Sequence, residues 1–219
     1  NKLTVNVSIL PIDTGRYGTK EMLEIFREQK KIDYQLEIEA AAVLSQNEIG
    51  LIPTSVARDI ARASKSGKIT AKRIKQLEAK SDHDTAALVE ALAEKCQKTS
   101  RPWIHYGLTS NDLVDTSNSM QMRDAIKIIQ PKVSKLSLLL SKNAVKYKNV
   151  PAVGRTHGQH ASIISFGLKF ANWAAEMSTH LERLDEIKKR VLICKTMGVV
   201  GTGSLMGKNA IRVQERVAR

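Results

Sequence analysis

The stretch SIISFGLKFANWAAEMSTHLERLDEIKKRVLIC, residues 162–194, decides the fold class of this chain. Small and apolar residues recur in it at three- and four-residue steps, which is the spacing of one face of an α-helix. This face consists of Leu168, Ala171, Ala175, Ser178, Leu181, Leu184, Ile187 and Val191. The pattern predicts one helix of about 33 residues, far longer than the helices of an ordinary compact domain. Helices of this length are typical of bundles, and the small residues favour close packing.

Shorter helices are predicted in the first half of the chain, after an extended start over 3–12 and a turn at 13–15. Apolar spacing and capping residues locate these helices. They cover 20–47, 54–65 with Thr54 as N-cap, 70–78 with Thr70 as N-cap, and a stretch that begins at Asp82 or Asp84 and ends before Arg101-Pro102.

Longer elements follow. A helix is predicted over 111–129, and Pro131 either kinks it or starts a second segment that reaches 148. A short irregular stretch over 151–161 leads into the long helix. A glycine-rich loop over 198–207 then precedes a last helix over 209–219.

These lengths predict an all-α chain with two domains. We expect an N-terminal domain of short helices over 1–110 and the first part of a central long-helix bundle over 111–219. The long helices have no closing partner within the sequence. We therefore expect a truncated bundle whose helices are covered by more chain, by other subunits, or by both.

The composition limits the class of protein. The 219 residues include 42% hydrophobic residues, and 35 Lys plus Arg stand against 22 Asp plus Glu, which argues against disorder. Cys96 and Cys194 lie far apart, which disfavours a disulfide scaffold or a cysteine-based zinc site. No apolar run approaches the length of a membrane span, and the N-terminus has no signal-peptide pattern. We expect a cytoplasmic location and no membrane partner.

The formal net charge of +13 leaves three interpretations open: a nucleic-acid partner, an anionic small substrate, or simply a basic surface. Lys and Arg are interleaved with Glu rather than gathered in one stripe. Aromatic residues, which would stack on bases, make up only 4% of the chain. We therefore expect no nucleic-acid partner.

The loop GRTHGQH, residues 154–160, is a candidate for catalysis. Glycines on both sides of His157 let the backbone approach a ligand, and the Arg, Thr and Gln of the loop supply hydrogen-bonding groups. An imidazole exchanges protons near neutral pH, so His157 is a candidate acid or base. A metal site at His157 and His160 is disfavoured because no carboxylate or thiol lies beside them, and no metal is expected.

Two further segments have both a structural and a functional interpretation. His83, in SDHD, is either incidental beside a capping aspartate or an imidazole at the positive end of a helix with a carboxylate to orient it. Thr109 and Ser110, in GLTSND, either cap a helix or direct hydroxyl groups at an anion such as a carboxylate.

Other motifs are weaker. Arg16 and Tyr17, in GRYG, are able to bind a phosphate through the guanidinium fork and the phenol. His105 lies between Ile104 and Tyr106, and we interpret it as a packing residue. The segment GTGSLMGK, residues 201–208, lacks the spacing of dinucleotide and P-loop motifs and is interpreted as a helix–helix turn.

Taken together and in this order, the segments resemble the fumarase/aspartase superfamily, and within it the adenylosuccinate lyase family. The matching segments are 10–18, 37–53, 83–84, 107–112, 154–159 and 198–202. The Thr109-Ser110 turn and the Thr156-His157 loop are common to the superfamily. The Arg16-Tyr17 turn points to the adenylosuccinate lyase family.

The resemblance implies an all-helical homotetramer with a shared central bundle, in which each active site is assembled from three subunits. The implied reaction is elimination of fumarate from adenylosuccinate and from the corresponding succinylated carboxamide nucleotide of purine synthesis. The substrate is thus an anionic nucleotide. The resemblance implies no metal and no organic cofactor.

The resemblance also assigns roles to residues. His157 is implied as the general acid for the leaving nitrogen, and His83 as a substrate contact that also supports this acid. The remaining implied substrate contacts are Thr156 beside the acid, Asp84, Thr109 and Ser110 at the succinyl carboxylates, Arg16 and Tyr17 at the nucleotide phosphate, and Gln159.

Two departures from the family pattern stand out. Asp82 occupies a position where relatives often carry a basic residue. The family's catalytic serine lies in a loop of the type S-S-x-M-P-x-K-x-N, and no such segment occurs between Asn1 and Arg219. The implied base is therefore expected outside this sequence, in a chain of which these residues form the N-terminal portion.

Alternatives remain at this point. Another superfamily lyase or a carboxymuconate cycloisomerase would share His157 and Thr109-Ser110 but would not need Arg16-Tyr17. A basic helical nucleic-acid-binding protein and an inactive scaffold are the alternatives from other classes.

Overall fold

The computed structural model describes residues 17–219 and divides into two compact units. The N-terminal unit consists of the chain up to Met122 together with Leu192–Arg219, and the hairpin unit consists of Arg123–Val191. The predicted extended start and turn over 3–15, and Arg16, lie outside the described residues. The predicted domain boundary between 110 and 111 stays a prediction.

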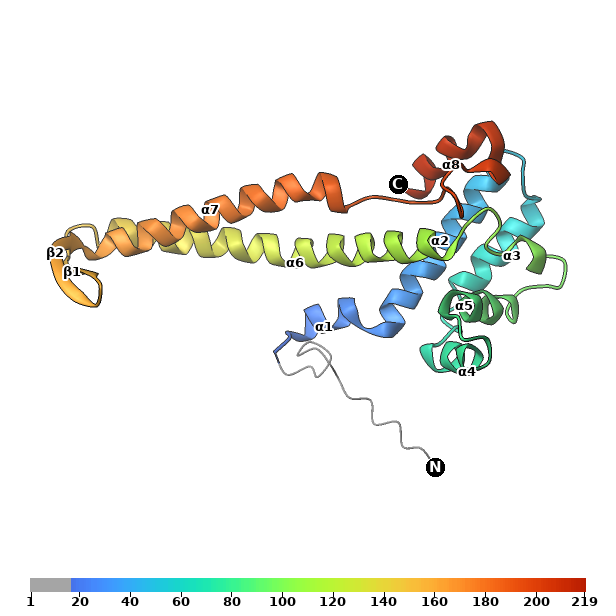
Figure 1. Ribbon diagram of the computed structural model, residues 1–219, viewed down its shortest axis with the longest axis horizontal. Helices are drawn as coiled ribbons and strands as arrows, with labels where there is room; N and C mark the ends of the chain where they lie inside the picture. Colours follow the sequence, from blue (N-terminus) through green and yellow to red (C-terminus); the bar gives the residue numbers. More distant parts are fainter. Residues whose placement is uncertain (1–16) are drawn as a thin grey trace, which may run out of the picture. The chain divides into compact units, whose positions relative to one another are not determined.

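The N-terminal unit is built mainly from short helices (Figure 1), and most of its buried apolar residues form one main core. Its elements are α1 (Lys20–Phe26), α2 (Glu28–Glu48), α3 (Thr54–Ser64), α4 (Ala71–Ser81), α5 (Asp84–Ala93), η1 (Arg101–Trp103), the start of α6 (Ser110–Lys146), η2 (Ser204–Asn209) and α8 (Ala210–Val217). Ile60 of α3, Leu77 of α4 and Leu88 of α5 are at most 2% exposed in this core. Met206, Ala210 and Val213 form a second, smaller cluster.

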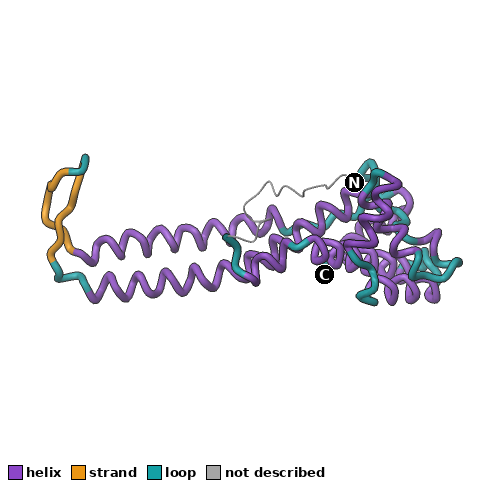
Figure 2. Tube along the Cα trace, turned by 90° about the horizontal axis from the view of Figure 1, so that it is seen from below, coloured by secondary structure: helices purple, strands orange, loops and turns teal. Residues whose placement is uncertain are grey.

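The hairpin unit contains the rest of α6, the strands β1 (Pro151–Thr156) and β2 (Gln159–Ser165), and α7 (Phe166–Val191). Figures 1 and 2 show α6 and α7 side by side, with the two strands where the helices connect. Gln130 donates a hydrogen bond to Asp185 at 2.9 Å across the helix pair. Within this unit only Ala125, Gly167 and Ala174 are buried, so the helix pair has no core of its own.

Gly167 allows the close approach of α7 to the end of α6. A Cβ at this position would lie 2.4 Å from the carbonyl oxygen of Ala144 and 2.9 Å from the amide nitrogen of Lys148. Its own amide donates to the carbonyl of Tyr147 at 3.0 Å. A side chain here would therefore push α7 away from the chain that leads into β1.

The structure confirms the all-α fold class, with the small hairpin as the exception. The predicted irregular stretch over 151–161 and the predicted helix start at Ser162 are wrong, because 151–156 and 159–165 pair as antiparallel strands. His157 and Gly158 have φ values of 52° and 71°, which is the conformation of a two-residue hairpin turn. The β-branched Ile163 and Ile164 suit the paired strand.

Other boundaries also differ from the prediction. The helix predicted over 20–47 is broken at Arg27, whose ψ is 140°, and no proline or glycine in the sequence marks this break. α6 continues through Pro131 as a single helix. The neighbouring Gln130 contacts α7, because it accepts a hydrogen bond from Lys188 at 2.5 Å. Thr54 is the first residue of α3 rather than its N-cap, whereas Thr70 caps α4 as predicted.

None of the helices between residues 17 and 219 combines the length and the apolar content needed to cross a lipid bilayer.

Candidate active site

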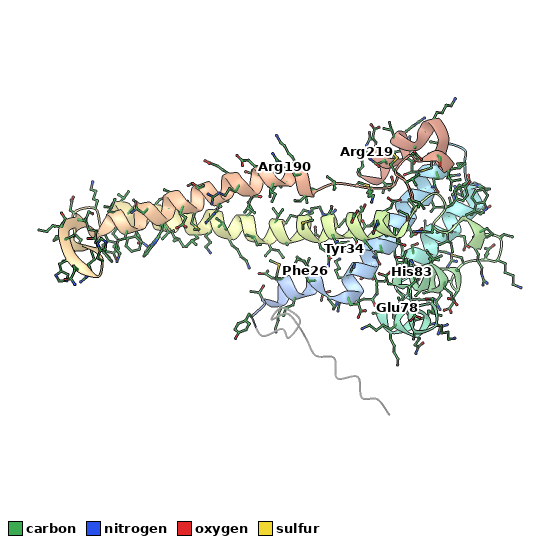
Figure 3. All side chains as sticks on the ribbon, viewed as in Figure 1. Phe26, Tyr34, Glu78, His83, Arg190 and Arg219 are labelled. Atoms are coloured by element: carbon green, nitrogen blue, oxygen red, sulfur yellow. The ribbon has the colours of Figure 1, made fainter. Side chains whose placement is uncertain are left out.

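His83 lies at the start of α5, where it is itself the N-cap (Figure 3). Its Nδ1 accepts a hydrogen bond from the amide of Ala86 at 3.2 Å. The sequence predicted Asp82 or Asp84 as the cap, and this prediction is wrong, because Asp82 has a φ of 51° and ends α4 instead. Since Nδ1 accepts, the proton of a neutral His83 ring must lie on Nε2. The fold therefore selects one tautomer of this imidazole.

Ser110, the first residue of α6, lies on the Nε2 side of the same ring. Its Oγ is 3.5 Å from Nε2, at the outer limit of a hydrogen bond. Asp84 lies on the other side, with its Oδ1 3.6 Å from Nδ1 and engaged by the amide of Thr85 at 2.6 Å. The structure thus brings together His83, Asp84, Thr109 and Ser110, which we call the helix-start cluster.

The turn that carries Thr109 and Ser110 is fixed by its own helix. Asp112, which is completely buried, accepts a hydrogen bond from the Thr109 amide through Oδ2 at 3.0 Å. The Asp112 amide donates in return to the Thr109 carbonyl at 2.9 Å. This reciprocal pair resembles a capping box. It leaves the Thr109 hydroxyl without a hydrogen bond within residues 17–219, so that hydroxyl is free for a ligand.

Two side chains of α2 hold the chain segment that leads into this turn. The sequence did not predict these contacts. Glu39, 2% exposed, accepts from the His105 amide at 3.1 Å and contacts His105 Nδ1 at 2.6 Å. Gln46, seven residues further along α2, donates to the Tyr106 carbonyl at 2.7 Å. His105 is thus an anchoring residue as well as a packing residue, and its φ of 60° is maintained by these contacts. The signal in the sequence was a carboxylate on the apolar face of α2.

The second group of candidates lies in the hairpin unit. His157 occupies the hairpin turn, flanked by Thr156 and Gln159, which pair across the strands. All three side chains are exposed. Among residues 17–219, no hydrogen bond engages the His157 imidazole. Both ring nitrogens are therefore open to a substrate.

His160 differs from His157 because it has a partner. The Arg155 guanidinium donates to its Nε2 at 3.1 Å. Because a guanidinium only donates, the Nε2 of His160 is the acceptor and is occupied in this arrangement. Within the described part of the chain, no group of three or more His, Cys, Asp or Glu side chains is arranged to hold a metal ion.

The remaining candidates are Tyr17 and Arg16. Tyr17 is 78% exposed just before α1, and Arg16 lies outside the described residues. The helix-start cluster belongs to the N-terminal unit and the hairpin turn to the hairpin unit. The structure therefore confirms neither a single assembled site nor the individual roles.

The helix-start cluster thus provides an imidazole beside hydroxyl groups at a helix start, and the hairpin turn provides a second, accessible imidazole. A sequence profile described as a lyase family matches residues 15–219, and the chain belongs to this lyase family, within the fumarase/aspartase superfamily.

Named relatives narrow the class. The chain is 42% identical over 212 residues, 97% of its length, to adenylosuccinate lyase of Methanocaldococcus jannaschii, and 39% identical over 97% of its length to that of Methanothermobacter thermautotrophicus. Its structure resembles β-carboxy-cis,cis-muconate cycloisomerase from Acinetobacter calcoaceticus sp. ADP1, with a TM-score of 0.85 and 30% identity over 91% of this chain and 48% of that one. The chain covers 46% and 47% of the two lyases, so it spans about half the length of these curated relatives.

Proposed function

We propose that the whole protein eliminates fumarate from adenylosuccinate, giving AMP, and from the succinylated carboxamide nucleotide of purine synthesis. The 42% identity to an adenylosuccinate lyase over 97% of the chain carries this proposal. The compared length includes both the helix-start cluster and the hairpin turn. The basic net charge of +13 also suits a substrate with one phosphate and two carboxylates.

The reaction requires a base and an acid. The base removes a proton from the carbon beside one succinyl carboxylate, the electron pair forms the double bond of fumarate, and the carbon–nitrogen bond breaks. The departing nitrogen gains a proton, and we assign its delivery to His157, whose ring nitrogens are accessible. The base would come from the serine loop characteristic of the family, for which this sequence has no counterpart.

The helix-start cluster would bind the succinyl part of the substrate. The start of α6 favours an anion, and the hydroxyl groups of Thr109 and Ser110 would donate to the carboxylates. His83, with its proton on Nε2, would contact the substrate and support the acid. Further contacts would come from Asp84, Thr156 and Gln159, and from Arg16 and Tyr17 at the phosphate.

We further propose a cytoplasmic homotetramer in which active sites are shared between subunits. Large apolar side chains of the hairpin unit support this assembly, because Leu136, Leu138, Leu139 and Trp173 are 45–56% exposed in a unit with almost nothing buried. A bundle with other subunits would cover them. In that assembly, 1–110 would be the N-terminal domain and 111–219 the start of the bundle domain.

A substrate comparison tests the proposal. The purified whole protein should release fumarate from both succinylated nucleotides and should not act on 3-carboxy-cis,cis-muconate. Turnover of the muconate without release of fumarate from either nucleotide would favour the cycloisomerase alternative.

A substitution of Arg16 also separates the adenylosuccinate lyase proposal from the cycloisomerase alternative. Arg16→Ala should raise the KM for adenylosuccinate by about ten-fold with little change in kcat, because a lost phosphate contact weakens binding before and during the reaction equally. An unchanged KM would remove its proposed role at the phosphate.

A further inference from the structure

Asp112 makes contacts beyond its own helix. The same Oδ2 that accepts from the Thr109 amide also accepts from the Gly198 amide at 2.9 Å. One carboxylate oxygen therefore joins the Thr109–Ser110 turn to a segment that lies 86 residues further along the chain.

Two neighbours on α6 hold the same segment. Thr116 Oγ1 accepts from the Lys195 amide at 2.9 Å and donates to the Lys195 carbonyl at 3.1 Å. The Lys195 ammonium contacts Asp115 at 3.2 Å. Positions 112, 115 and 116 share one face of the helix, so the segment lies along the first two turns of α6. Only Asp112 also contacts the turn.

The backbone of the segment also approaches the turn closely. Gly198 has a φ of 76°, and a Cβ on it would lie 3.0 Å from the carbonyl oxygen of Gly107. Gly107 begins the turn that continues to Thr109. A shift of the segment would therefore be transmitted directly to the residues before Thr109.

The burial of Asp112 gives the link its strength. The side chain is 0% exposed, and its second oxygen, Oδ1, has no hydrogen-bond partner within the described residues. Both of its accepted hydrogen bonds are charge-assisted and shielded from water, so they are stronger than ordinary backbone bonds. Asp112 also faces the thiol of Cys194, whose pKa is raised chiefly by burial and further by this carboxylate, while a hydrogen bond with Thr116 lowers it.

We propose that Asp112 is a positioning residue for the dicarboxylate half of the substrate. By holding Thr109 and Gly198 with one oxygen, it fixes the direction of the Thr109 and Ser110 hydroxyl groups before substrate binds. This proposal deepens the proposed function and rests on it. It assigns Asp112 no contact with substrate.

Product binding to the whole protein tests the proposal, with fumarate and AMP as separate calorimetric probes. Asp112→Ala should weaken fumarate binding by about ten-fold or more and leave AMP binding unchanged, because only the turn loses its support. Asp112→Asn should weaken fumarate by only about three-fold, since one amide oxygen can still accept both bonds without the charge. Asp115→Asn is the matched control, because it removes a contact to Lys195 without touching the turn, and should leave both affinities unchanged.

The outcomes separate a positioning role from a structural one. Equal loss of fumarate and AMP binding in Asp112→Ala would indicate general damage and overturn the proposal, as would unchanged fumarate binding or a wild type that does not bind fumarate. If Asp112→Ala does not fold, Asp112→Asn decides by the same comparison of fumarate with AMP. Failure of the wild type to release fumarate from adenylosuccinate, with fumarate binding intact, would instead remove the proposed function.

Discussion

The two units of this chain differ in how many apolar side chains they bury. The N-terminal unit buries side chains such as Ile60, Leu88 and Leu92 in a core of its own. The hairpin unit buries only Ala125, Gly167 and Ala174, although its helices carry many large apolar residues. The N-terminal unit therefore gains packing energy within the chain, whereas the hairpin unit leaves its large apolar side chains exposed. Each unit also carries candidate site residues.

Loss of His157 should have the largest effect. In the whole protein, His157→Ala should lower kcat for adenylosuccinate by about 10²- to 10⁴-fold, because the leaving nitrogen loses its proton donor. The thermal unfolding midpoint should not change, since the side chain is exposed on the hairpin turn. The control is His180→Ala, which changes a half-buried histidine of α7 that contacts Arg183 at 3.2 Å. Near-normal fumarate release by His157→Ala would contradict the assignment of the acid.

Leucine-to-alanine substitutions should lower the free energy of unfolding by different amounts in the two units. Leu88, 1% exposed, lies in the N-terminal core, and Leu138, 56% exposed, lies in the hairpin unit. In the 219-residue chain, Leu88→Ala should lower the free energy of unfolding by about 2–5 kcal/mol, and Leu138→Ala by less than about 0.5 kcal/mol.

Urea unfolding followed by tryptophan fluorescence measures both changes in the free energy of unfolding, because Trp103 and Trp173 lie in different units. Replacing one tryptophan by Phe leaves the other as the reporter of its unit. Equal losses for Leu88→Ala and Leu138→Ala would show that the hairpin unit has a core within this chain.

Asp59 in the N-terminal unit and Asp185 in the hairpin unit should contribute differently to the pH dependence of stability. Burial alone would raise the pKa of Asp59, but hydrogen bonds from Arg62 at 2.6 Å and from the Gln97 amide at 2.8 Å outweigh burial and hold this pKa below its ordinary value. A lowered folded-state pKa stabilises the fold above the unfolded pKa of about 4, and this stability is lost as pH falls toward the folded value.

Asp59→Asn should therefore cost about 2 kcal/mol at pH 7 and should flatten the decline of stability below pH 4, measured by urea titration across pH. In the hairpin unit, Asp185→Asn is the control. The pKa of Asp185 is also lowered, chiefly by Lys188, but its side chain is 61% exposed, so the unfolding midpoint should not move. A pH profile of Asp59→Asn that matches the wild type would contradict this account.

Helix periodicity predicted most of the fold. The long helix was predicted because its face repeats without interruption from Leu168 to Val191, but the predicted range of 162–194 extends beyond α7 at both ends. The hairpin was not predicted because its turn requires a left-handed backbone conformation at both His157 and Gly158. Of these two residues, only glycine commonly adopts that conformation. The break at Arg27 has no proline or glycine beside it in the sequence, and Pro131, which the sequence suggested as a kink or a new start, lies inside the continuous helix α6.

The candidate site was predicted as residue types but not as geometry. The neighbourhood of His83 and Ser110 joins positions 27 residues apart, and the role of His83 as cap depends on Asp82 taking a left-handed conformation. The anchoring of His105 by Glu39 spans 66 residues. Such pairings arise from tertiary packing. Sequence motifs therefore identify the candidate site residues but do not show which of them are in contact.

Mixing two inactive variants tests most directly the central claim, that the two histidines act in one site assembled from different subunits. Whole-protein His83→Ala and His157→Ala, each nearly inactive alone, should be unfolded together, refolded as an equal mixture and assayed for fumarate release. Random assembly would leave about a quarter of the sites with both histidines intact, so about a quarter of wild-type activity should return. A mixture that stays as inactive as its two components would contradict the shared site.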